Sequence, residues 1–367
     1  MMIRDPAHRR QTPAGGFSLP TRAGALKGSA PGPERGHSFK GANPIMLWMF
    51  LEIAFGLGLL YVGGEAMVRG AVALGRWLDL SPLVVGIIII GFATSMPELV
   101  VSVQAVWQGL PEIATGNILG SNTANILLVL GATALVLPMH HQPRALPRDA
   151  LPLLLSGGVF ALLGLLYGLV HPVAGAVLFL ALVGLLSHEF RRARRETRLS
   201  RELAEELAEE VEPHPLLGNP LLASLAALIG LGMLVYGGHL FVSGASAVAA
   251  ALGVSHGLIG LTLVALGTSS PELASALVAA RHGHSDVAYG NVVGSNLFNV
   301  LGVGGAAAMA GGLTYPDLMS VFDGPVMLAA TVLMLAFFAS SRGLTRTRGA
   351  LFVGAYIAYI ALRASFS

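Results

Sequence analysis

Thr94-Ser95-Met96-Pro97-Glu98 is a polar pentapeptide inside a long apolar stretch, and Thr268-Ser269-Ser270-Pro271-Glu272 repeats its pattern in the second half of the chain. The stretch Leu83 to Ala93, just before it, carries no charge. An acid inside a membrane-embedded segment is costly, so it is a functional candidate by default. The proline removes a backbone donor and predicts a helix broken beside the acid, which leaves carbonyl and hydroxyl oxygens nearby. This composition is typical of a cation site.

The bulk composition indicates a membrane protein. Of the 367 residues, 54% are hydrophobic and 11% are charged, and the mean hydropathy is +0.71. These values exclude an ordinary soluble globular protein and predict an all-α polytopic membrane protein surrounded by the lipid bilayer. The chain has no cysteine, which excludes disulfides and thiolate metal sites. No nucleic-acid partner is indicated, and the sequence leaves the oligomeric state open.

Apolar segments of about 20 residues, enough to span a bilayer core of about 30 Å, recur from Leu47 onward. We expect ten transmembrane helices, of which the second and the seventh are interrupted at Pro97 and Pro271. Their expected ranges are 45–66, 70–108, 111–137, 148–168, 171–190, 217–238, 243–281, 285–312, 319–340 and 346–364.

A shift of 174 positions superposes the first half of the chain on the second without a gap. It places Pro97-Glu98 on Pro271-Glu272. It also places Gly116-Asn117-x-x-Gly120-Ser121-Asn122-x-x-Asn125 on Gly290-Asn291-x-x-Gly294-Ser295-Asn296-x-x-Asn299. Because each copy holds five helices, an odd number, the second copy enters the membrane from the opposite side. Two inverted five-helix repeats are a design of secondary transporters, which bind their ions near the midplane where interrupted helices meet.

The expected domains are a tail at 1–44, a first five-helix repeat at 45–190, a linker at 191–216 and a second, inverted five-helix repeat at 217–367. The tail is rich in Pro, Gly and Arg and lacks the apolar core of a signal peptide, so we expect a disordered tail or an over-extended start. In the linker an arginine block precedes a glutamate block, and its leucine spacing predicts a short amphipathic helix in a solvated connector.

The arginines predict the orientation. The joints on one side of the ten expected helices contain no Lys or Arg, whereas those on the other side hold Arg69, Arg76, Arg144, Arg148, Arg191, Arg192, Arg194, Arg195, Arg198, Arg201, Arg281, Arg342, Arg346 and Arg348. By the positive-inside rule the arginine-rich side is cytoplasmic, which places the linker in the cytoplasm and both termini in the periplasm. The tail conflicts with this orientation because it carries seven Lys and Arg residues.

Hydroxyl, amide and carboxylate oxygens dominate the two motifs. Four-residue spacing puts Asn117, Ser121 and Asn125 on one helix face, and the neighbouring glycines allow close helix packing, which would bring that face toward the carboxylates. The amides could instead only bridge helices. Ca²⁺ takes six to eight hard oxygens, two carboxylates neutralise one such ion, and Na⁺ uses the same ligands. Without cysteine or a nearby histidine, Zn²⁺ and Cu are disfavoured.

Both motifs together resemble the two α-repeats of the cation/calcium exchanger superfamily, specifically the prokaryotic sodium/calcium exchangers. The resemblance covers about 45–367 and implies Ca²⁺/Na⁺ antiport by alternating access in a prokaryotic inner membrane, with two helices sliding against a rigid body. It implies no enzymatic step and no cofactor. The ligands of Ca²⁺ and Na⁺ that it implies are Glu98, Glu272, Thr94, Thr268, Ser95, Ser269, Ser121, Ser295, Asn125, Asn299, Gly91 and Ala265.

One departure and two alternatives remain. Many relatives have aspartate where this chain has Asn299, and asparagine there resembles the potassium-independent members, so we expect no K⁺ requirement. Exchange of Ca²⁺ or Mn²⁺ for H⁺ on the same carboxylates is the alternative within transport. An intramembrane hydrolase that uses Ser95 or Ser269 is disfavoured because no histidine or lysine lies nearby in the sequence to act as its base.

Other polar residues have simpler interpretations. Asp149 and Asp323 begin expected helices, so we expect them to cap free backbone amides. Glu52 and Glu65 are expected at the membrane interface rather than among the ligands. The histidines of the arginine-rich side, which we expect to be solvated in loops, are His140, His141, His282 and His284.

Overall fold

The computed structural model describes residues 44–139, 146–199, 218–253, 265–340 and 342–366, which are mostly helical. The described residues belong to one unit, Asn43–Ser367. The expected tail, apart from Pro44, lies outside the described residues. So does most of the expected linker, although the helix before it continues as far as Leu199.

The first half of the chain forms ten helical segments and one short strand within the described ranges. They are α1 (Pro44–Trp77), α2 (Pro82–Val84), the π-helical segment η1 (Val85–Ile90), α3 (Gly91–Thr94), α4 (Met96–Trp107), α5 (Pro111–Ala124), the π-helical segment η2 (Asn125–Leu130), α6 (Gly131–Val136), α7 (Leu146–Tyr167), β1 (Leu169–Val170) and α8 (Pro172–Leu199).

The second half repeats the order of the main helices as far as the structure describes it. Its elements are α10 (Pro220–Ala251), α12 (Ala265–Thr268), α13 (Ser270–Arg281), α14 (Ser285–Leu297), the π-helical segment η5 (Phe298–Val303), α15 (Gly304–Gly311), β2 (Leu313–Thr314), the π-helical segment η6 (Met319–Asp323), α16 (Gly324–Ala339) and α17 (Arg346–Ser365). The strands differ in place, since β2 precedes α16 whereas β1 follows α7. The bounds of α12 and α13 are those of α3 and α4 displaced by 174 residues. The sequence repeat is therefore also a repeat of helices.

The first helix of each half is longer than the sequence predicts. The joint expected at 67–69 lies inside α1, and the joint expected at 239–242 lies inside α10. Arg69 misled the prediction because its charge indicated a loop, whereas its Nε pairs with Glu65 one turn earlier on the same helix at 2.9 Å. In the sequence, an ion pair between two residues one turn apart on a helix cannot be distinguished from charges at a helix end.

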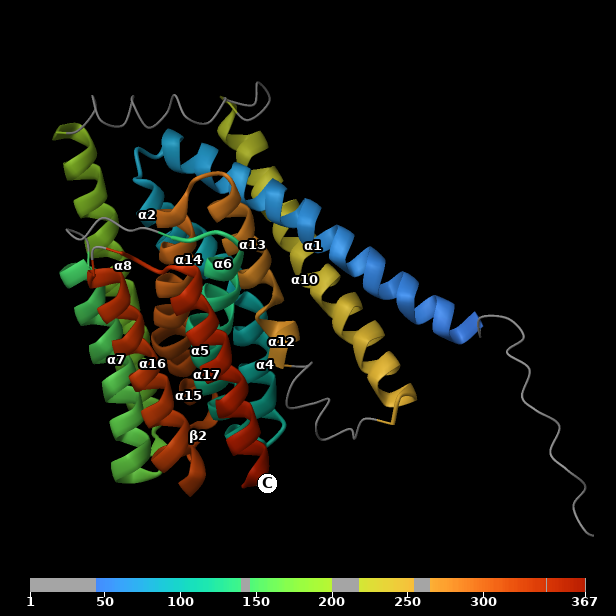
Figure 1. The fold of residues 1–367 in the computed structure, drawn as a ribbon. Helices are drawn as coiled ribbons and strands as arrows, with labels where there is room; N and C mark the ends of the chain where they lie inside the picture. Colours follow the sequence, from blue (N-terminus) through green and yellow to red (C-terminus); the bar gives the residue numbers. More distant parts are fainter. Residues whose placement is uncertain (1–43, 140–145, 200–217, 254–264, 341, 367) are drawn as a thin grey trace, which may run out of the picture. The chain divides into compact units, whose positions relative to one another are not determined.

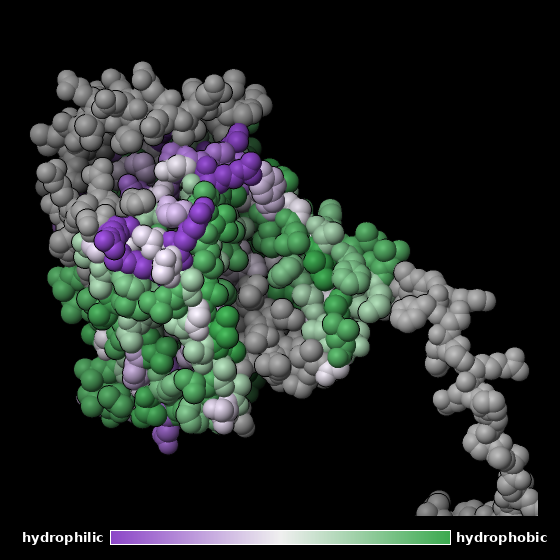
Figure 2. All heavy atoms as spheres, in the orientation of Figure 1, coloured by the Kyte–Doolittle hydropathy of each residue, from purple (hydrophilic) through white to green (hydrophobic). Residues whose placement is uncertain are grey.

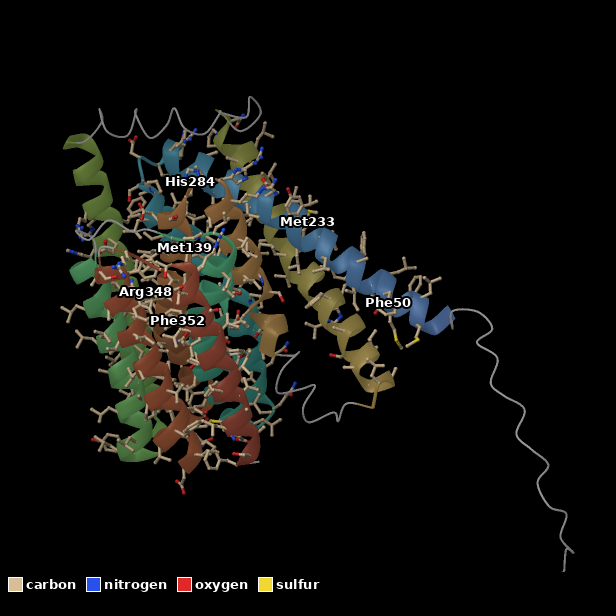
Figure 3. All side chains as sticks on the ribbon, viewed as in Figure 1. Phe50, Met139, Met233, His284, Arg348 and Phe352 are labelled. Atoms are coloured by element: carbon tan, nitrogen blue, oxygen red, sulfur yellow. The ribbon has the colours of Figure 1, made fainter. Side chains whose placement is uncertain are left out.

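Helices α1 and α10 pack side by side along much of their length (Figure 1). Glycines allow this approach: a Cβ on Gly56 would lie 2.8 Å from the carbonyl oxygen of Gly237, and one on Gly230 would lie 2.6 Å from that of Gly63. Met233 of α10, labelled in Figure 3, also faces Gly63. Gly230 and Gly237 are the repeat counterparts of Gly56 and Gly63. The contact is therefore reciprocal between the halves, and the two helices run antiparallel.

Two short backbone pairings show the same reciprocity. Val170 of β1 pairs with Leu313 of β2, and Met139 pairs with Leu344 in an isolated antiparallel bridge. Leu313 and Leu344 are the repeat counterparts of Met139 and Val170, respectively. The two pairings are therefore equivalent: in each, a residue of one half pairs with the residue of the other half that its repeat counterpart predicts. Figure 3 shows Met139 near Arg348, at the end of the unit away from β2 in Figure 1.

The apolar helices fit a bilayer. Six of the described helices are long and apolar enough to span it, and the bent pair Pro82–Thr94 with Met96–Trp107 makes up to seven. Figure 2 shows apolar side chains over most of the face in view, with hydrophilic ones gathered toward one end. Large apolar side chains are exposed on these helices, among them Phe55, Leu180 and Leu228. The chain is a multi-pass membrane protein.

The remaining expected spans correspond to three other segments, so the expected total of ten is not reached by length and apolarity in the described ranges. The apolar part of α7, Leu151–Tyr167, is shorter. Helices α12 and α13 follow 254–264, which lies outside the described residues. Helix α17 begins with Arg346 and Arg348 and is less apolar than the six.

The helices of the asparagine motifs lie in the interior. The most apolar window of Ser285–Gly311 is 89% buried and that of Pro111–Val136 is 78% buried, whereas the windows in α1 and α8 are each 17% buried. Helices α5 and α14 therefore form the centre of the unit. Their polar side chains face other helices instead of lipid.

Asp323 does not cap a helix, contrary to the sequence prediction. It has helical backbone angles (φ −66°, ψ −42°) and makes no side-chain cap bond. Its carboxylate instead accepts hydrogen bonds from the hydroxyl of Tyr359 at 2.9 Å and from Nε of Arg363 at 3.1 Å. The acid therefore ties the start of α16 to α17. The side chain of Asp149, its repeat counterpart, lies outside the described residues.

Candidate cation site

The interrupted helices break at the serine before each Pro-Glu pair. Ser95 has φ −83° and ψ 0°, and Ser269 has φ −88° and ψ 4°, angles that neither continue a regular helix nor extend the chain. Pro97 has no N–H, so its helical bond to Ala93 is missing. The segments on either side of Ser95 are bent by 41°. The predicted interruption is confirmed at this position.

Each break places its glutamate in the first turn of a new helix. Glu98 lies in the first turn of α4 and Glu272 in the first turn of α13. The backbone amides at a helix N-terminus carry partial positive charge, which stabilises an acid there. Both acids are fully embedded, with exposed fractions of 1% and 0%. The local sequence therefore sets two carboxylates at two symmetric breaks.

The two carboxylates accept no hydrogen bond of standard geometry within the part of the chain that the structure describes, although the hydroxyl of Thr94 lies near the carboxylate of Glu272. They also lie close enough for the charge on Glu98 to act on Glu272. Two buried acids that repel each other and remain unpaired are strongly unfavourable by themselves. The arrangement is stabilised when a positive charge binds between them.

Hydroxyl groups of the first break meet the second asparagine motif. The hydroxyl of Thr94 lies 3.1 Å from that of Ser295 and donates to Oδ1 of Asn291 at 3.3 Å. Ser295 in turn donates to the carbonyl of Gly91, and Ser95 donates to the carbonyl of Ser295, both at 3.5 Å. Residues about 200 positions apart thus form one cluster. The first break therefore contacts the second asparagine motif, and the part of these oxygens in ion binding stays a prediction.

An amide supports each glutamate through the backbone. Nδ2 of Asn117 lies 3.4 Å from the carbonyl oxygen of Glu98, and Nδ2 of Asn291 lies 3.3 Å from that of Glu272. The same amides donate at 3.0 Å to the hydroxyls of Ser102 and Ser275. The main chain of each acid is therefore fixed, while its carboxylate keeps its oxygens for another partner.

Asparagines at the centre connect the two halves directly. Asn122 donates to the carbonyl of Asn296 at 3.4 Å, and Asn296 donates to that of Asn122 at 3.3 Å. Asn125 donates to Oδ1 of Asn296 at 3.1 Å, which leaves its own Oδ1 without a partner among the described residues. Both polar atoms of Asn299 are likewise unpaired within the described ranges. These oxygens are available to a cation.

The donor set is that of a hard cation. It consists of carboxylate, hydroxyl, amide and main-chain oxygens, which Ca²⁺ and similar ions prefer over the ligands of transition metals. Among the described residues no three His, Asp or Glu side chains are grouped so that they could hold a metal ion together, and the chain has no cysteine. The fixed charge at the breaks therefore comes from two carboxylates. One divalent ion or two monovalent ions neutralise it.

The sequence matches a known family over both halves. The family model described as "Sodium/calcium exchanger protein" matches residues 48–190 and 222–364, two ranges that are 174 residues apart. The chain belongs to the sodium/calcium exchanger protein family. The matched ranges contain both breaks and both asparagine motifs, so the conclusion covers the complete candidate site.

Relatives of this exchanger-family chain match it over nearly their whole length. The inner membrane protein YrbG of Escherichia coli is 34% identical over 323 residues, covering 86% of this chain and 97% of the relative. The sodium/calcium exchanger MaX1 of Methanosarcina acetivorans is 28% identical, covering 85% and 97%. A structure of the sodium-calcium exchanger NCX_Mj superposes with a TM-score of 0.72 at 29% identity, covering 87% and 99%.

Most of the predicted ligands of this exchanger-family chain are buried, but their exposed fractions differ. Ser121 is 5% exposed and bonds to Asn117 on its own helix at 3.5 Å, and Ser269 is 2% exposed. Thr268 is partly exposed, and Ala265 begins α12 with a side chain outside the described set. Their part in ion binding stays a prediction.

The sequence analysis did not select two serines that support the acids. Ser102 and Ser275 accept from the supporting amides, yet they are not repeat counterparts, since the shift of 174 places Ser102 on Ala276. A search for duplicated residues therefore misses them. Asn117 and Asn291 were visible in the motif but were not chosen as site residues, and their spacing from Ser121 and Ser295 was the available signal.

Proposed function

We propose that this chain is a secondary antiporter that exchanges Ca²⁺ for Na⁺ across the membrane by alternating access. The observation that carries the proposal is the pair of buried glutamates, Glu98 and Glu272, whose carboxylates have no hydrogen-bond partner among the described residues. One Ca²⁺ neutralises the pair, and Na⁺ ions can replace it on the same oxygens. Membership of the sodium/calcium exchanger family supports this choice of ions.

The proposed ions bind at the junction of the two breaks. Glu98 and Glu272 supply the charge, and the uncharged ligands are Thr94, Thr268, Ser95, Ser269, Ser121, Ser295, Asn125, Asn299 and the main chain near Gly91 and Ala265. The hydrogen bonds that join Thr94 and Gly91 to Ser295 support a shared site, because the participants come from both halves. Transport needs no covalent step and no cofactor, so the chain is not an enzyme.

The proposed architecture is ten transmembrane helices in two inverted repeats of five. The reciprocal, antiparallel contacts of α1 with α10 support it. If a two-fold axis exchanges two antiparallel helices, the axis is perpendicular to both helices. For helices that span a bilayer, such an axis lies in the membrane plane, as inverted repeats require.

The proposed location is the inner membrane of a prokaryote, with the arginine-rich end and the linker in the cytoplasm and both termini in the periplasm. The positive-inside rule supports this orientation, and YrbG is named an inner membrane protein. A reporter fused after Ser367 tests it, and cytoplasmic activity of the reporter overturns it.

Transport in proteoliposomes tests the proposed function. The purified full chain is reconstituted with Na⁺ inside, and uptake of radioactive Ca²⁺ is measured at the same pH on both sides. We expect an outward Na⁺ gradient to drive uptake, and Glu98→Gln proteoliposomes to show none. Uptake that ignores the Na⁺ gradient contradicts the proposal.

Exchange of Ca²⁺ or Mn²⁺ for H⁺ is the second candidate. The unpaired carboxylates favour it to the same degree, because two repelling acids can also bind protons. A pH gradient without Na⁺ separates the two. Uptake driven by that gradient and unaffected by Na⁺ supports proton exchange.

A further inference from the structure

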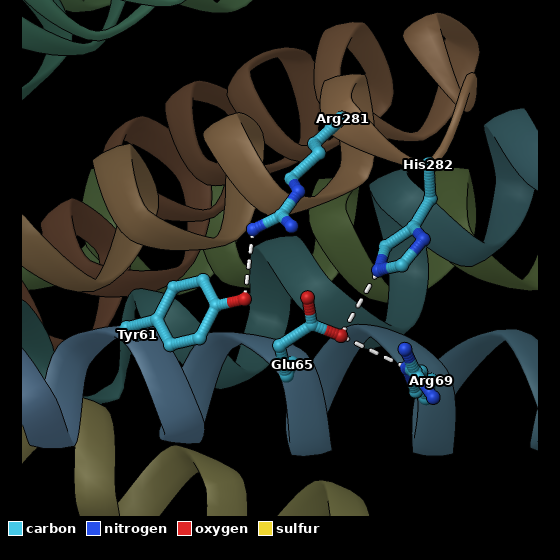
Figure 4. Close-up of polar contacts among 5 residues, drawn as sticks. All are labelled: Tyr61, Glu65, Arg69, Arg281 and His282. Carbon is cyan, nitrogen blue, oxygen red and sulfur yellow. Dashed lines mark hydrogen bonds and ion pairs between the residues drawn. The ribbon is translucent and has the colours of Figure 1, made fainter.

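Four side chains connect α1 to α13 at the arginine-rich end of the unit (Figure 4). Arg281 donates to the hydroxyl of Tyr61 at 2.7 Å, and its guanidinium lies over the Tyr61 ring at 5.6 Å from the ring centre. Nε2 of His282 lies 2.9 Å from Oε2 of Glu65, the oxygen that also pairs with Arg69 of α1. We call Tyr61, Glu65, Arg281 and His282 the clasp.

The clasp has no equivalent at the symmetric position. The repeat counterparts of Tyr61 and Glu65 on α10 are Val235 and His239, and those of Arg281 and His282 beside α4 are Trp107 and Gln108. These four include neither an acid nor an arginine, so the ion pair and the tyrosine bond have no counterpart there. The clasp is therefore not duplicated by the repeat among the described residues.

The packing of the helices differs in the same direction. Helix α1 lies along α13, where a Cβ on Gly64 would be 3.1 Å from Cγ2 of Val278. The symmetric contact, α10 with α4, is at most marginal among the described residues. Gly238, the counterpart of Gly64, faces Gly267 and Ser270 instead. The α1–α10 pair is thus held asymmetrically between the two halves.

Alternating access moves one bundle against another around a fixed site. In a two-fold arrangement, the two orientations exchange the contacts that α1 makes with α13 and those that α10 makes with α4. A bond set present in only one of them lowers the free energy of that orientation alone. The clasp joins α1 to the helix that carries Glu272, so its bonds break when α1 leaves α13.

We propose that the clasp is a set of positioning residues that favours the orientation in which α1 lies against α13, an inference that rests on the alternating access proposed above. Its members bind no ion. The side chains of Glu65 and His282 are 18% and 28% exposed. A partly exposed ion pair of this kind changes an equilibrium about two- to fivefold.

Spin-label distances measure this equilibrium without transport. The chain has no native cysteine, so Trp77→Cys and Thr347→Cys, both at exposed positions, give one labelled pair between α1 and α17. The full chain is measured in lipid nanodiscs without Ca²⁺. We expect one dominant distance, and a second population whose ratio rises about two- to fivefold with Glu65→Ala.

Helix α10 provides matched controls: His239 is the counterpart of Glu65, and Tyr236 follows Val235, the counterpart of Tyr61. His239→Ala and Tyr236→Phe on α10 should leave the distances unchanged, whereas Tyr61→Phe, which removes one oxygen, should shift them. Glu65→Ala and His282→Ala combined should shift the ratio less than the product of the single effects, because both remove one bond. Tyr61→Phe also keeps the test valid if Glu65→Ala fails to fold.

Two results overturn the proposal: distances that neither Tyr61→Phe nor Glu65→Ala changes, or equal changes with His239→Ala. These two outcomes can be told apart from a failure of the proposed ion exchange. In that case the proteoliposomes show no Na⁺-driven uptake, while the distances still report whether the clasp holds α1.

Discussion

The side-chain amide of Asn291 on α14 donates a 3.3 Å hydrogen bond to the main-chain carbonyl of Glu272 on α13. It approaches the acid from its backbone and makes no bond to the carboxylate. The same amide donates to the hydroxyl of Ser275 at 3.0 Å. The buried asparagine therefore fixes the position of the proposed ion-binding acid without neutralising it or occupying its oxygens.

Asn291→Ala should weaken both the fold and ion binding. The change removes both hydrogen bonds that this amide donates, which costs about 1–3 kcal/mol of unfolding free energy. The Glu272 carbonyl keeps only the side-chain bond from the Ser275 hydroxyl at 3.0 Å, so its backbone is held less firmly. We expect a lower melting temperature and a higher Ca²⁺ concentration for half-maximal uptake. Ser275→Ala is the control: it loses the two bonds of the Ser275 hydroxyl but keeps the bond from Asn291 to the Glu272 carbonyl, so it should have the smaller effect on uptake. Wild-type uptake by Asn291→Ala contradicts the role assigned here.

Glu272→Gln should separate stability from function. Replacing a buried, unpaired acid by a neutral amide removes a desolvation cost, so the variant should melt at a higher temperature than the wild type without Ca²⁺. It also removes one of two charges that hold the ion, a loss of about 3–5 kcal/mol, or roughly 100-fold or more in affinity. We therefore expect no Ca²⁺-dependent rise in melting temperature and no measurable uptake.

Differential scanning fluorimetry with and without Ca²⁺ checks both parts of this prediction. Glu65→Gln, which changes an acid outside the candidate site, is the matched control and should keep its Ca²⁺-dependent stabilisation. If Glu272→Gln still responds to Ca²⁺ like the wild type, the ion does not bind this carboxylate.

Gly230→Ala should separate α1 from α10. The new Cβ would lie 2.4 Å from the backbone nitrogen of Met67, so the helices must move apart. Forced overpacking of this kind costs about 1–3 kcal/mol. Gly232→Ala lies on the same helix with nothing within 4 Å of its Cβ, and it should be neutral or slightly stabilising. Thermal unfolding of both variants checks the contrast, which equal melting temperatures would refute.

Most of the helix arrangement could be predicted from the sequence, because the two copies of the repeat align at a constant spacing of 174 residues without a gap. Pro97 and Pro271 fixed both helix breaks, since a missing N–H acts locally and needs no tertiary information. Helix ends were harder to place. Arg69 looked like part of a loop, because the sequence does not show that its charge is paired with Glu65 on the same face.

Tertiary contacts account for what the sequence could not give. Asp323 was expected to cap its own helix, but its partners Tyr359 and Arg363 lie about 40 residues away. His282 was expected to be solvated, and its partner Glu65 is 217 residues away. Both side chains have local and distant options, and packing of other helices decides between them. The motifs, by contrast, indicated the candidate site from the sequence alone, because the same carboxylate, hydroxyl and amide residues occur in both halves of the chain.

Asn299 should make transport independent of K⁺. It is fully buried, and neither polar atom of its side chain has a partner among the described residues. As an amide it adds an oxygen but no charge, so two carboxylates and one Ca²⁺ form a neutral site. No additional cation is required for balance. The rate of Ca²⁺ uptake driven by an outward Na⁺ gradient should therefore be the same with K⁺ present as when choline replaces all K⁺. A loss of uptake in choline contradicts the prediction.

Asn299→Asp tests the same charge balance in the opposite direction. The third carboxylate leaves one negative charge when Ca²⁺ is bound, and a buried unpaired charge is strongly unfavourable. A proton or a monovalent cation must then accompany Ca²⁺. We expect uptake by the variant to depend on K⁺, where the wild type does not, or to depend more steeply on pH than wild-type uptake does. Asn219→Asp, at the exposed start of α10, adds the same charge away from the site and should behave as the wild type. If Asn299→Asp shows the wild-type dependence on both ions, the carboxylate does not share the site of Glu98 and Glu272.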